Sequence, residues 1–188
     1  MFSRPRQFAL ILAILALVLA AMACGTSSNG PSASLPTEAE TVEANAPSGE
    51  SAIDVNHPYD EQADPKADIA AVMERAKAGS KYVLLDFGAN WCPDCIVLAT
   101  LFEDPSVKPY LDANFHVVHI DVGYWDWDKN LDVSEQYGNP IEKGIPALVV
   151  LTPDSEMVAT TKAGELANAR TATADDVLAY LHQWAPTQ

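Results

Sequence analysis

The chain has 188 residues, which is room for one ordinary domain with extensions but not for two full domains. Its 26 acidic and 11 basic side chains give a net charge of -15, which disfavours direct binding to nucleic acid or to anionic lipid headgroups. We interpret the acidity as keeping the protein soluble rather than as recognition of a basic partner.

Residues 1–23 have the pattern of a secretory signal. Two arginines precede an apolar run over residues 8–23, which as a helix would measure about 24 Å, short of the ~30 Å core of a bilayer. The run ends at Ala21-Met22-Ala23-Cys24-Gly25, which resembles the lipobox of bacterial lipoproteins, with Ala21 where that family usually has leucine. The resemblance implies that Cys24 is acylated, and it explains why one of three cysteines has no partner.

This reading predicts a protein of the bacterial cell envelope, lipid-anchored and facing the periplasm or the exterior. An ordinary cleaved signal or an uncleaved anchor helix would also place the chain outside the cytoplasm. Residues 24–58 are rich in Ser, Pro, Ala and Glu and contain no aromatic residue, so they cannot bury enough apolar surface to offset their ordering entropy. We predict a flexible tether there, followed by one folded domain over residues 59–188.

The domain begins with a helix, because Asp64-Pro65 is typical of an N-cap followed by proline at the first helical position. Gly79 is expected to close this helix. The apolar run over 82–87 predicts a strand buried on both faces. Five further elements are expected in chain order: helices at 96–102 and 105–114, and strands at 115–122, 146–151 and 157–161.

The remaining features of the domain are a tight turn, a capped helix and a long connection. Pro153-Asp154 marks the turn between the last two strands, and Thr173 is expected to cap the final helix. The connection over residues 123–143 carries Trp125 and Trp127. These two side chains either extend a docking surface or cover part of the core.

A cysteine pair, Trp91-Cys92-Pro93-Asp94-Cys95, follows the first buried strand and opens a helix. Cys92 would lie at the helix N-terminus, where unpaired N–H groups and the helix dipole favour an anion. Because the thiolate is the nucleophilic form of cysteine, this placement lowers the pKa of the Cys92 thiol and activates it. Cys95 lies one turn further on the same helix face and can resolve a mixed disulfide formed by Cys92.

Two other segments complete the candidate site. Asp86 lies in the middle of the apolar strand, six residues before Cys92. A carboxyl beneath a dithiol should have a raised pKa and can exchange a proton with the resolving thiol, unless Asp86 faces solvent at the strand end. Gly144-Ile145-Pro146 opens a later apolar strand, where proline is ordinary as a first residue, and the sequence does not decide whether its peptide bond is cis.

The segment 86–95 resembles the active-site segment of the thioredoxin superfamily, and Gly144-Ile145-Pro146 resembles its cis-proline loop. The resemblance covers roughly residues 60–185 in element order. It implies an α/β, thioredoxin-like fold with a central mixed sheet flanked by helices. It also implies a thiol–disulfide oxidoreductase. Its redox group would be the disulfide Cys92–Cys95, and it would need no further cofactor.

The family's residue roles carry over position by position. Cys92 would attack, Cys95 would resolve, and Asp86 would serve as the buried acid. The substrate would be bound by Trp91, Ile145 and Pro146. The peptide bond before Pro146 would be cis, and the backbone of Ile145 would pair with an extended substrate segment.

Two positions depart from the family pattern. Thr100 stands where typical thioredoxins have a proline that kinks the active-site helix, so this helix is expected to run straight. Val117 stands at the strand position that usually supplies a lysine facing the buried acid, which leaves the proton route of Asp86 without its usual partner.

Zinc binding is an alternative use of the cysteine pair, with His116 and His119 as further ligands. Strand alternation puts these histidines on opposite faces, so we predict no metal site and interpret both as structural. A purely structural disulfide is disfavoured because its four-residue loop constrains the unfolded chain little. A lipoprotein that uses the fold as a binding or assembly module remains open.

The direction of electron flow is predicted from the acidic residues near Cys92. Asp94 beside it and Asp86 below it should oppose the thiolate, and a less stabilised thiolate makes a weaker oxidant. We therefore expect reduction or isomerisation of protein disulfides, with a disulfide oxidase as the alternative. The expected partners are envelope proteins with thiols or disulfides and a membrane dithiol electron donor, and not nucleic acid.

Overall fold

The computed structural model of the chain describes residues 53–125 and 128–186. The predicted signal, Cys24, residues 24–52 of the predicted tether, and Trp127 lie outside the described residues. Within the described part of the chain, no helix combines the length and the apolar character needed to cross a bilayer.

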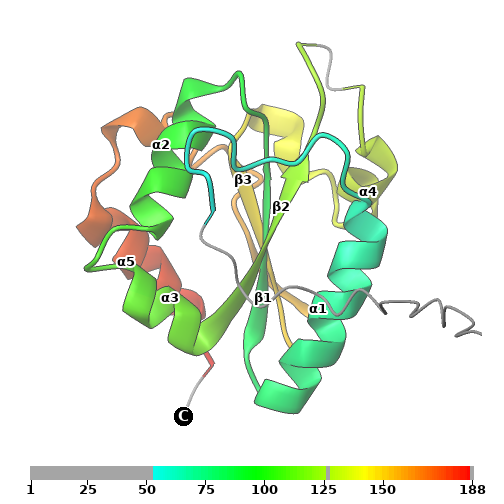
Figure 1. The fold of residues 1–188 in the computed structure, drawn as a ribbon, viewed down its shortest axis with the longest axis vertical. Helices are drawn as coiled ribbons and strands as arrows, with labels where there is room; N and C mark the ends of the chain where they lie inside the picture. Colours follow the sequence, from blue (N-terminus) through cyan, green and yellow to red (C-terminus); the bar gives the residue numbers. More distant parts are fainter. Residues whose placement is uncertain (1–52, 126–127, 187–188) are drawn as a thin grey trace, which may run out of the picture. The chain divides into compact units, whose positions relative to one another are not determined.

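A four-stranded sheet lies at the centre of the described residues (Figure 1). Strand β1 (Tyr82–Gly88) pairs in parallel with β2 (Phe115–Asp121) and antiparallel with β3 (Ala147–Leu151), which pairs antiparallel with β4 (Met157–Thr160). The strand order is β2-β1-β3-β4, so β2 is an edge strand beside the central β1. The predicted α/β fold with a mixed sheet is confirmed.

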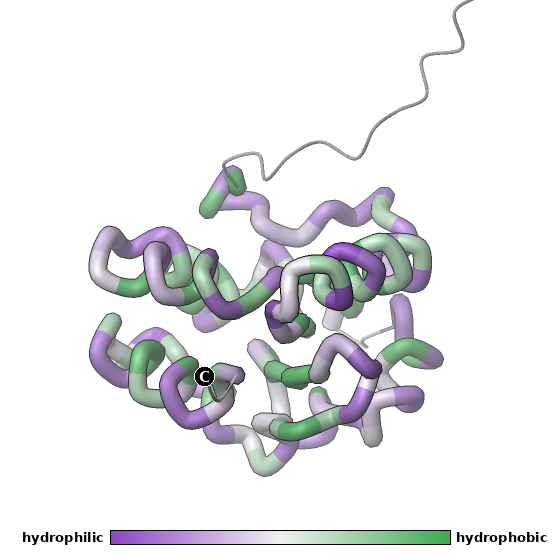
Figure 2. Tube along the Cα trace, turned by 90° about the horizontal axis from the view of Figure 1, so that it is seen from below, coloured by the Kyte–Doolittle hydropathy of each residue, from purple (hydrophilic) through white to green (hydrophobic). Residues whose placement is uncertain are grey.

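Helices cover both faces of the sheet. One face is covered by α1 (Pro65–Gly79), and the other by α2 (Pro93–Phe102), α3 (Lys108–Asn114) and α5 (Ala174–Trp184) (Figure 1). The turned view shows hydrophilic and hydrophobic residues alternating along these helices, as expected of helices with one buried side (Figure 2).

The strand β1 is buried on both faces, as predicted, and its side chains alternate between two cores. Val83, Leu85 and Phe87 belong to the core under α1, whereas Leu84 belongs to the core shared with α2, α3 and α5. Asp86 is two residues from Leu84, so this alternation directs it to the face covered by the helix that begins at the cysteine pair.

The helix caps agree with the sequence at two of three places. The Asp64 side chain accepts the backbone N–H groups of Lys66 and Ala67 at 3.0 and 3.2 Å, which confirms the predicted start of α1. Thr173 caps α5 in a reciprocal capping box, also as predicted. The end of α1 differs: Gly79 remains helical, and Ser80 adopts the left-handed conformation with φ 55°.

Three short elements were not predicted. The long connection contains α4 (Leu131–Gln136) and the 3₁₀ helix η1 (Pro140–Lys143), and a second 3₁₀ helix, η2, covers Ala169–Thr171. None of them has a side-chain cap, so no capping signal marks them in the sequence. Helix α3 starts three residues later than predicted, because the residues before it form a turn closed by the bond from Val107 N–H to the Asp104 carbonyl at 2.9 Å.

The segment 53–64 crosses the edge of the sheet at β2, from the side of α2 to that of α1, before it enters α1 (cyan in Figure 1). Its backbone is fixed at Tyr59, whose N–H donates to Asn90 Oδ1 at 3.1 Å and whose carbonyl accepts from Asn90 Nδ2 at 2.7 Å. These two bonds turn the Tyr59 side chain into the interior, where it is only 1% exposed.

Candidate active site

Cys92 occupies the N-cap position of α2, and Pro93 is the first helical residue. The Cys92 Sγ accepts the backbone N–H of Cys95 at 3.3 Å, so the sulfur sits where unpaired helix N–H groups converge. Both cysteines are free thiols and both are buried, with Cys92 4% and Cys95 0% exposed. The local arrangement is the one that the sequence predicts.

The two thiols differ in acidity. The hydrogen bond with Cys95 lowers the pKa of Cys92, and backbone N–H groups of Cys95 and Asp94 act in the same direction against burial. Burial raises the pKa of Cys95 strongly, and contact with Cys92 and the charge of Asp86 raise it further. The arrangement therefore favours the thiolate at Cys92 and the protonated thiol at Cys95.

The Ile145–Pro146 peptide bond is cis, as the family resemblance implies. It precedes β3 and lies against the cysteine pair, because the Cys92 Sγ is 3.8 Å from the carbonyl oxygen of Ile145. Ile145 is 7% exposed, and Pro146 is also buried. The structure thus brings together the loop and the helix start that the sequence indicated separately.

Asp86 is fully buried at the face of β1 that α2 covers, so it does not face solvent. Its Oδ2 accepts the Tyr59 hydroxyl at 2.9 Å and lies 2.8 Å from Nδ1 of His119. Its charge raises the pKa of Cys95, which places the two groups within electrostatic reach of each other. Chemically, Asp86 can exchange a proton with the second thiol of the pair.

Sequence reasoning missed both partners of Asp86. His119 was interpreted as structural, yet the parallel register of β1 and β2 pairs it directly with Asp86. The expectation that Val117 stands at the strand position facing the buried acid is wrong, because Val117 pairs with Leu84 and His119 occupies that position. The two strands were predicted to begin at residues 82 and 115. Pairing them in parallel from these first residues would have placed His119 opposite Asp86. Tyr59 has no comparable signal, because it reaches Asp86 from an irregular segment.

A further residue missed from the sequence is Arg170, in η2. Its backbone N–H and its Nε donate to Asp94 Oδ1 at 2.9 and 3.0 Å, and its Nη2 forms an ion pair with Asp94 Oδ2. These bonds lower the pKa of Asp94 below its ordinary value. The charge of Asp94 does raise the pKa of Cys92, as predicted, but it is outweighed by the hydrogen bonds that lower this pKa, and the Arg170 guanidinium pairs with Asp94.

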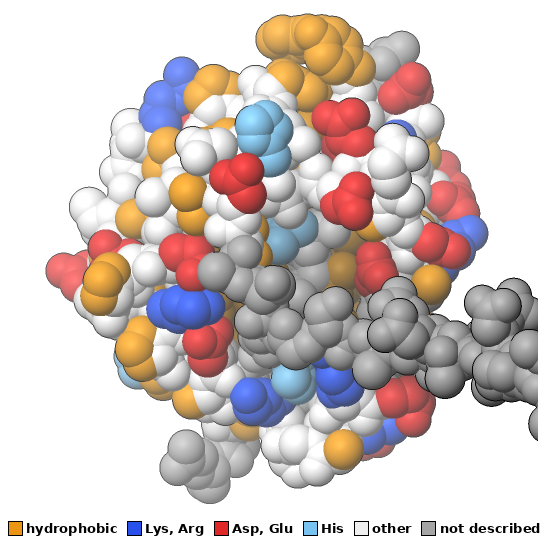
Figure 3. Space-filling model, viewed as in Figure 1, with side chains coloured by type: hydrophobic (Ala, Val, Ile, Leu, Met, Phe, Trp, Pro, Cys, Tyr) orange, Lys and Arg blue, Asp and Glu red, His pale blue; other side chains and the backbone are white. Residues whose placement is uncertain are grey.

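Aromatic side chains extend the surface next to the cysteine pair. Trp91 donates from Nε1 to the carbonyl of Gly123 at 2.8 Å, and the ring centroid of Trp125 lies 4.4 Å from that of Trp91. Trp125 is 71% exposed and Tyr124 is 62% exposed, so neither covers core. Figure 3 shows hydrophobic side chains protruding at this end of the molecule.

The loop that carries Tyr124 and Trp125 is anchored by Asp121, whose Oδ2 lies 2.8 Å from Lys129 Nζ.

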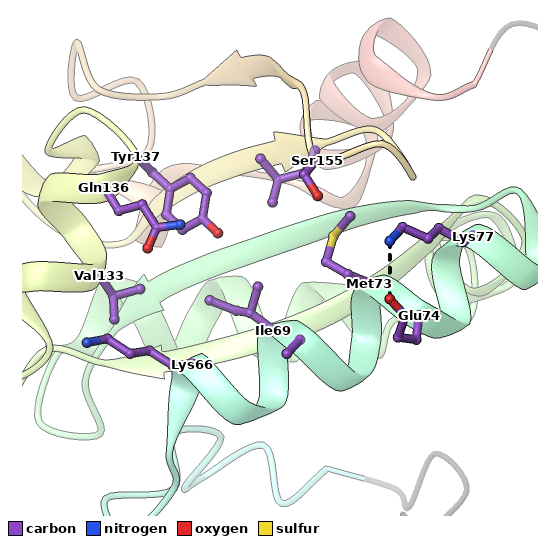
Figure 4. Close-up of a pocket in the computed structure, with 11 residues that line it drawn as sticks. Lys66, Ile69, Met73, Glu74, Lys77, Val133, Gln136, Tyr137 and Ser155 are labelled. Atoms are coloured by element: carbon purple, nitrogen blue, oxygen red, sulfur yellow. Dashed lines mark hydrogen bonds and ion pairs between the residues drawn. The ribbon is translucent and has the colours of Figure 1, made fainter. Parts of the chain in front are cut away.

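A separate hollow lies between α1, α4 and the turn of the last hairpin (Figure 4). Ile69, Met73 and Tyr137 line it, and an ion pair between Lys77 and Glu74 at 3.1 Å lies at one end. It contains no thiol and is not the candidate active site. Across the described residues, no group of three or more His, Cys, Asp or Glu side chains is arranged to hold a metal ion.

Comparison with known proteins gives consistent results. A family model described as thioredoxin-like matches residues 64–153. The chain is 40% identical over 86 residues to a thioredoxin of Buchnera aphidicola, covering 46% of this chain and 68% of that protein. It is 37% identical over 49 residues to thioredoxin H4 of Arabidopsis thaliana, covering 26% of this chain and only 41% of that protein.

Two solved structures are similar to this one. The disulphide isomerase from Xylella fastidiosa is 40% identical, with a TM-score of 0.65, and the match covers 68% of this chain and 95% of that chain. The reduced C-terminal domain of DsbD from Neisseria meningitidis is 26% identical, with a TM-score of 0.50, and the match covers 65% of this chain and 97% of that chain.

Proposed function

Because this chain belongs to the thioredoxin-like family, we propose that it is a thiol–disulfide oxidoreductase in which Cys92 attacks and Cys95 resolves. The observation that carries the proposal is the unequal pair of thiols. Cys92 is the helix N-cap with a lowered pKa, and Cys95 is the buried partner with a raised pKa. An inert structural cysteine pair needs no such asymmetry.

The reaction follows from this asymmetry. The Cys92 thiolate attacks one sulfur of a substrate disulfide, and the electron pair of the broken S–S bond leaves with the other substrate sulfur. Cys95 then loses its proton, with Asp86 as the acceptor, and attacks the Cys92 sulfur of the mixed disulfide. The Cys92–Cys95 disulfide forms, and the substrate leaves with two reduced sulfurs.

Substrate contact is assigned to the surface around Cys92. The Ile145 carbonyl, just before Pro146, lies against its sulfur, and an extended substrate segment pairing with the Ile145 backbone would bring its own sulfur alongside. Trp91 and the exposed Trp125 stacked on it offer a wide apolar surface next to this position. Such a surface favours a protein substrate over a small disulfide.

Reduction or isomerisation is the proposed direction. The charge of Asp94 opposes the Cys92 thiolate, although Arg170 pairs with Asp94, and a thiolate at Cys95 is disfavoured by burial, by Cys92 and by Asp86. The similar structure from Xylella fastidiosa carries the name disulphide isomerase. A pair of this kind receives electrons from another dithiol, for which a membrane protein is the proposed donor.

Location and partners are proposed from the sequence. Cys24 is the proposed lipid attachment site, and the envelope is the proposed compartment, with thiol- or disulfide-containing envelope proteins as substrates. Mass spectrometry of the mature N-terminus tests the anchor directly. A diacylated Cys24 at the first position is expected, and an unmodified Cys24 thiol contradicts it.

Substrate trapping tests the function. In cells expressing the full chain with Cys95→Ser, mixed disulfides should accumulate on Cys92, because the resolving thiol is missing. The matched control, Cys92→Ser with Cys95 intact, should capture no partners. If Cys95→Ser captures nothing while the protein remains folded and functional in its cells, the fold acts as a binding or assembly module instead.

The reduction potential of the Cys92–Cys95 couple tests the direction separately. A reductase or isomerase is expected to lie well below the strongly oxidising value of about -120 mV found for a dedicated disulfide oxidase. A measured value near that limit would make this protein an oxidase, and the roles of the two cysteines would remain as assigned.

A further inference from the structure

The proposed mechanism makes no use of His119, although it contacts the buried acid. The parallel register pairs Asp86 with His119, and Nδ1 of His119 lies 2.8 Å from Oδ2 of Asp86. The His119 side chain is only 10% exposed. An imidazole in direct contact with the acid of a redox site can change charge in the neutral pH range, which a packing residue cannot do.

The two oxygens of Asp86 have different surroundings. Oδ2 accepts the Tyr59 hydroxyl at 2.9 Å and also contacts His119, whereas Oδ1 is buried without a hydrogen-bond partner among the described residues. Burial and the charge of Asp86 raise the pKa of Tyr59 well above its ordinary value, so Tyr59 is a permanent donor. Oδ2 is therefore held in place, and Oδ1 is the oxygen left to take a proton from Cys95.

The second ring nitrogen of His119 has no hydrogen-bond partner either, within the part of the chain that the structure describes. His119 lines a hollow of about 390 Å³ beside the edge strand β2, and the charged side chains around that hollow are Asp60, Asp68 and Arg75. The ring thus lies between the charged rim of this hollow on one side and Asp86 with Tyr59 on the other.

We propose that His119 is the positioning residue of Asp86 in the resolving step, and that the charge on its ring decides whether Asp86 Oδ1 can take the Cys95 proton. The inference rests on the proposed oxidoreductase function. A neutral ring that donates from Nδ1 orients the carboxylate. A ring protonated also at Nε2 adds a positive charge that holds Asp86 ionised and opposes the transfer.

The step balances without any further reactant. The Cys95 S–H bond breaks, and its proton moves to Asp86 Oδ1. The electron pair left on the Cys95 sulfur attacks the Cys92 sulfur, so that the Cys92–Cys95 bond forms. The bond between Cys92 and the substrate sulfur breaks, and its electron pair leaves with the substrate as a thiolate. Resolution should therefore be faster when the His119 ring is neutral than when it is protonated.

The test compares two His119 variants with a matched control in the full chain. His119→Gln keeps an N–H donor for Asp86 but cannot change charge, and His119→Val removes both properties. His116→Gln is the control, since His116 lies on the same strand and its register partner is Val83, on the opposite face. Reduced protein is mixed with a disulfide-linked peptide, and quenched samples are analysed by mass spectrometry for the mixed disulfide and its decay between pH 5 and 8.

The decay of the mixed disulfide should accelerate with pH in the unmodified protein and in His116→Gln. His119→Val should slow this decay by roughly tenfold or more, and His119→Gln should retain the rate but lose its dependence on pH. Both His119 variants decaying with the rate and pH profile of the unmodified protein would overturn the inference. A failure of the unmodified protein to form any mixed disulfide on Cys92 would instead contradict the proposed function.

Discussion

Arg170 binds the carboxylate of Asp94 across 76 residues of sequence with three hydrogen bonds, one from its backbone N–H and two from its guanidinium. Asp94 lies between the two cysteines, so this ion pair fixes the charge next to the attacking sulfur. The hydrogen bonds and charge of Asp94 raise the pKa of Arg170, and the Cys92 thiolate adds to this rise, so the guanidinium lies within electrostatic reach of that sulfur. The acidity of Cys92 therefore depends on a residue outside the cysteine motif.

Arg170→Met should reduce the reactivity of Cys92, because the Asp94 charge would then act on the thiolate without compensation. The pKa of Cys92 would then rise, and its alkylation by iodoacetamide at neutral pH should slow about threefold. The double variant Arg170→Met with Asp94→Asn should recover the original rate. An unchanged alkylation rate in the single variant would contradict this account.

Asp94 should contribute to stability in a defined pH range. Arg170 lowers the pKa of folded Asp94 below its ordinary value of 3.8. The stabilisation is therefore fully present above about pH 4 and is lost as the pH falls through the pKa of the folded state. Urea unfolding should show the unmodified protein more stable than Asp94→Asn at pH 6, with a difference that shrinks toward pH 3. A difference independent of pH would argue against the ion pair.

Asp86→Asn should slow resolution and stabilise the fold at the same time. The asparagine oxygen can still accept from Tyr59, and the substitution removes a fully buried carboxylate charge. We expect a gain of about 1–3 kcal/mol in the free energy of unfolding, because a neutral amide costs less to bury than a carboxylate. Mixed disulfides on Cys92 should decay more slowly, and loss of stability would show that the charge of Asp86 is needed for folding.

Gly88→Ala should displace Tyr59 from the site. A Cβ at Gly88 would lie 2.2 Å from the Tyr59 hydroxyl oxygen, which is too close for both atoms to remain in place. Such overpacking costs about 1–3 kcal/mol, measured as the free energy of unfolding. The matched control is Gly79→Ala, where a new Cβ meets only the Lys81 side chain at 3.9 Å. Equal stability of the two variants would contradict the close approach of Tyr59.

Trp125→Ala should affect protein substrates more than small disulfides. The side chain is 71% exposed and stacks only on Trp91 and Tyr124 in the described structure, so its loss should cost less than about 1 kcal/mol of stability. We expect a raised KM for a protein disulfide and an unchanged rate with a small aromatic disulfide. Equal losses with both substrates would mean that Trp125 shapes the cysteine pair rather than a docking surface.

The parts of the site that the sequence predicts are local ones. The N-cap position of Cys92 depends on a buried strand followed directly by Pro93, and both are visible within a short window. The burial of Asp86 follows from its place within an apolar strand. The helix caps at Asp64 and Thr173 were predictable for the same reason, because a capping side chain acts within three residues.

The parts that the sequence does not predict depend on the packing of distant segments. Arg170 reaches Asp94 from a 3₁₀ helix that follows the sheet, and Tyr59 reaches Asp86 from the segment before α1. Neither has a periodicity or spacing that ties it to its partner. The contact of His119 with Asp86 could have been predicted, but only from the correct register of β1 and β2. An error of one residue in that register would have placed His119 on the opposite face from Asp86.

The segment 53–64, which crosses the edge of the sheet, has a practical consequence for any attempt to transplant this chemistry. The span matched by the thioredoxin-like family model, residues 64–153, includes both sulfurs and both acids but neither Tyr59 nor Arg170. A fragment cut to that span would keep the reactive pair and His119, and it would lose two other side chains that hold the acids in place. Grafts of the cysteine pair should therefore include the flanking residues on both sides.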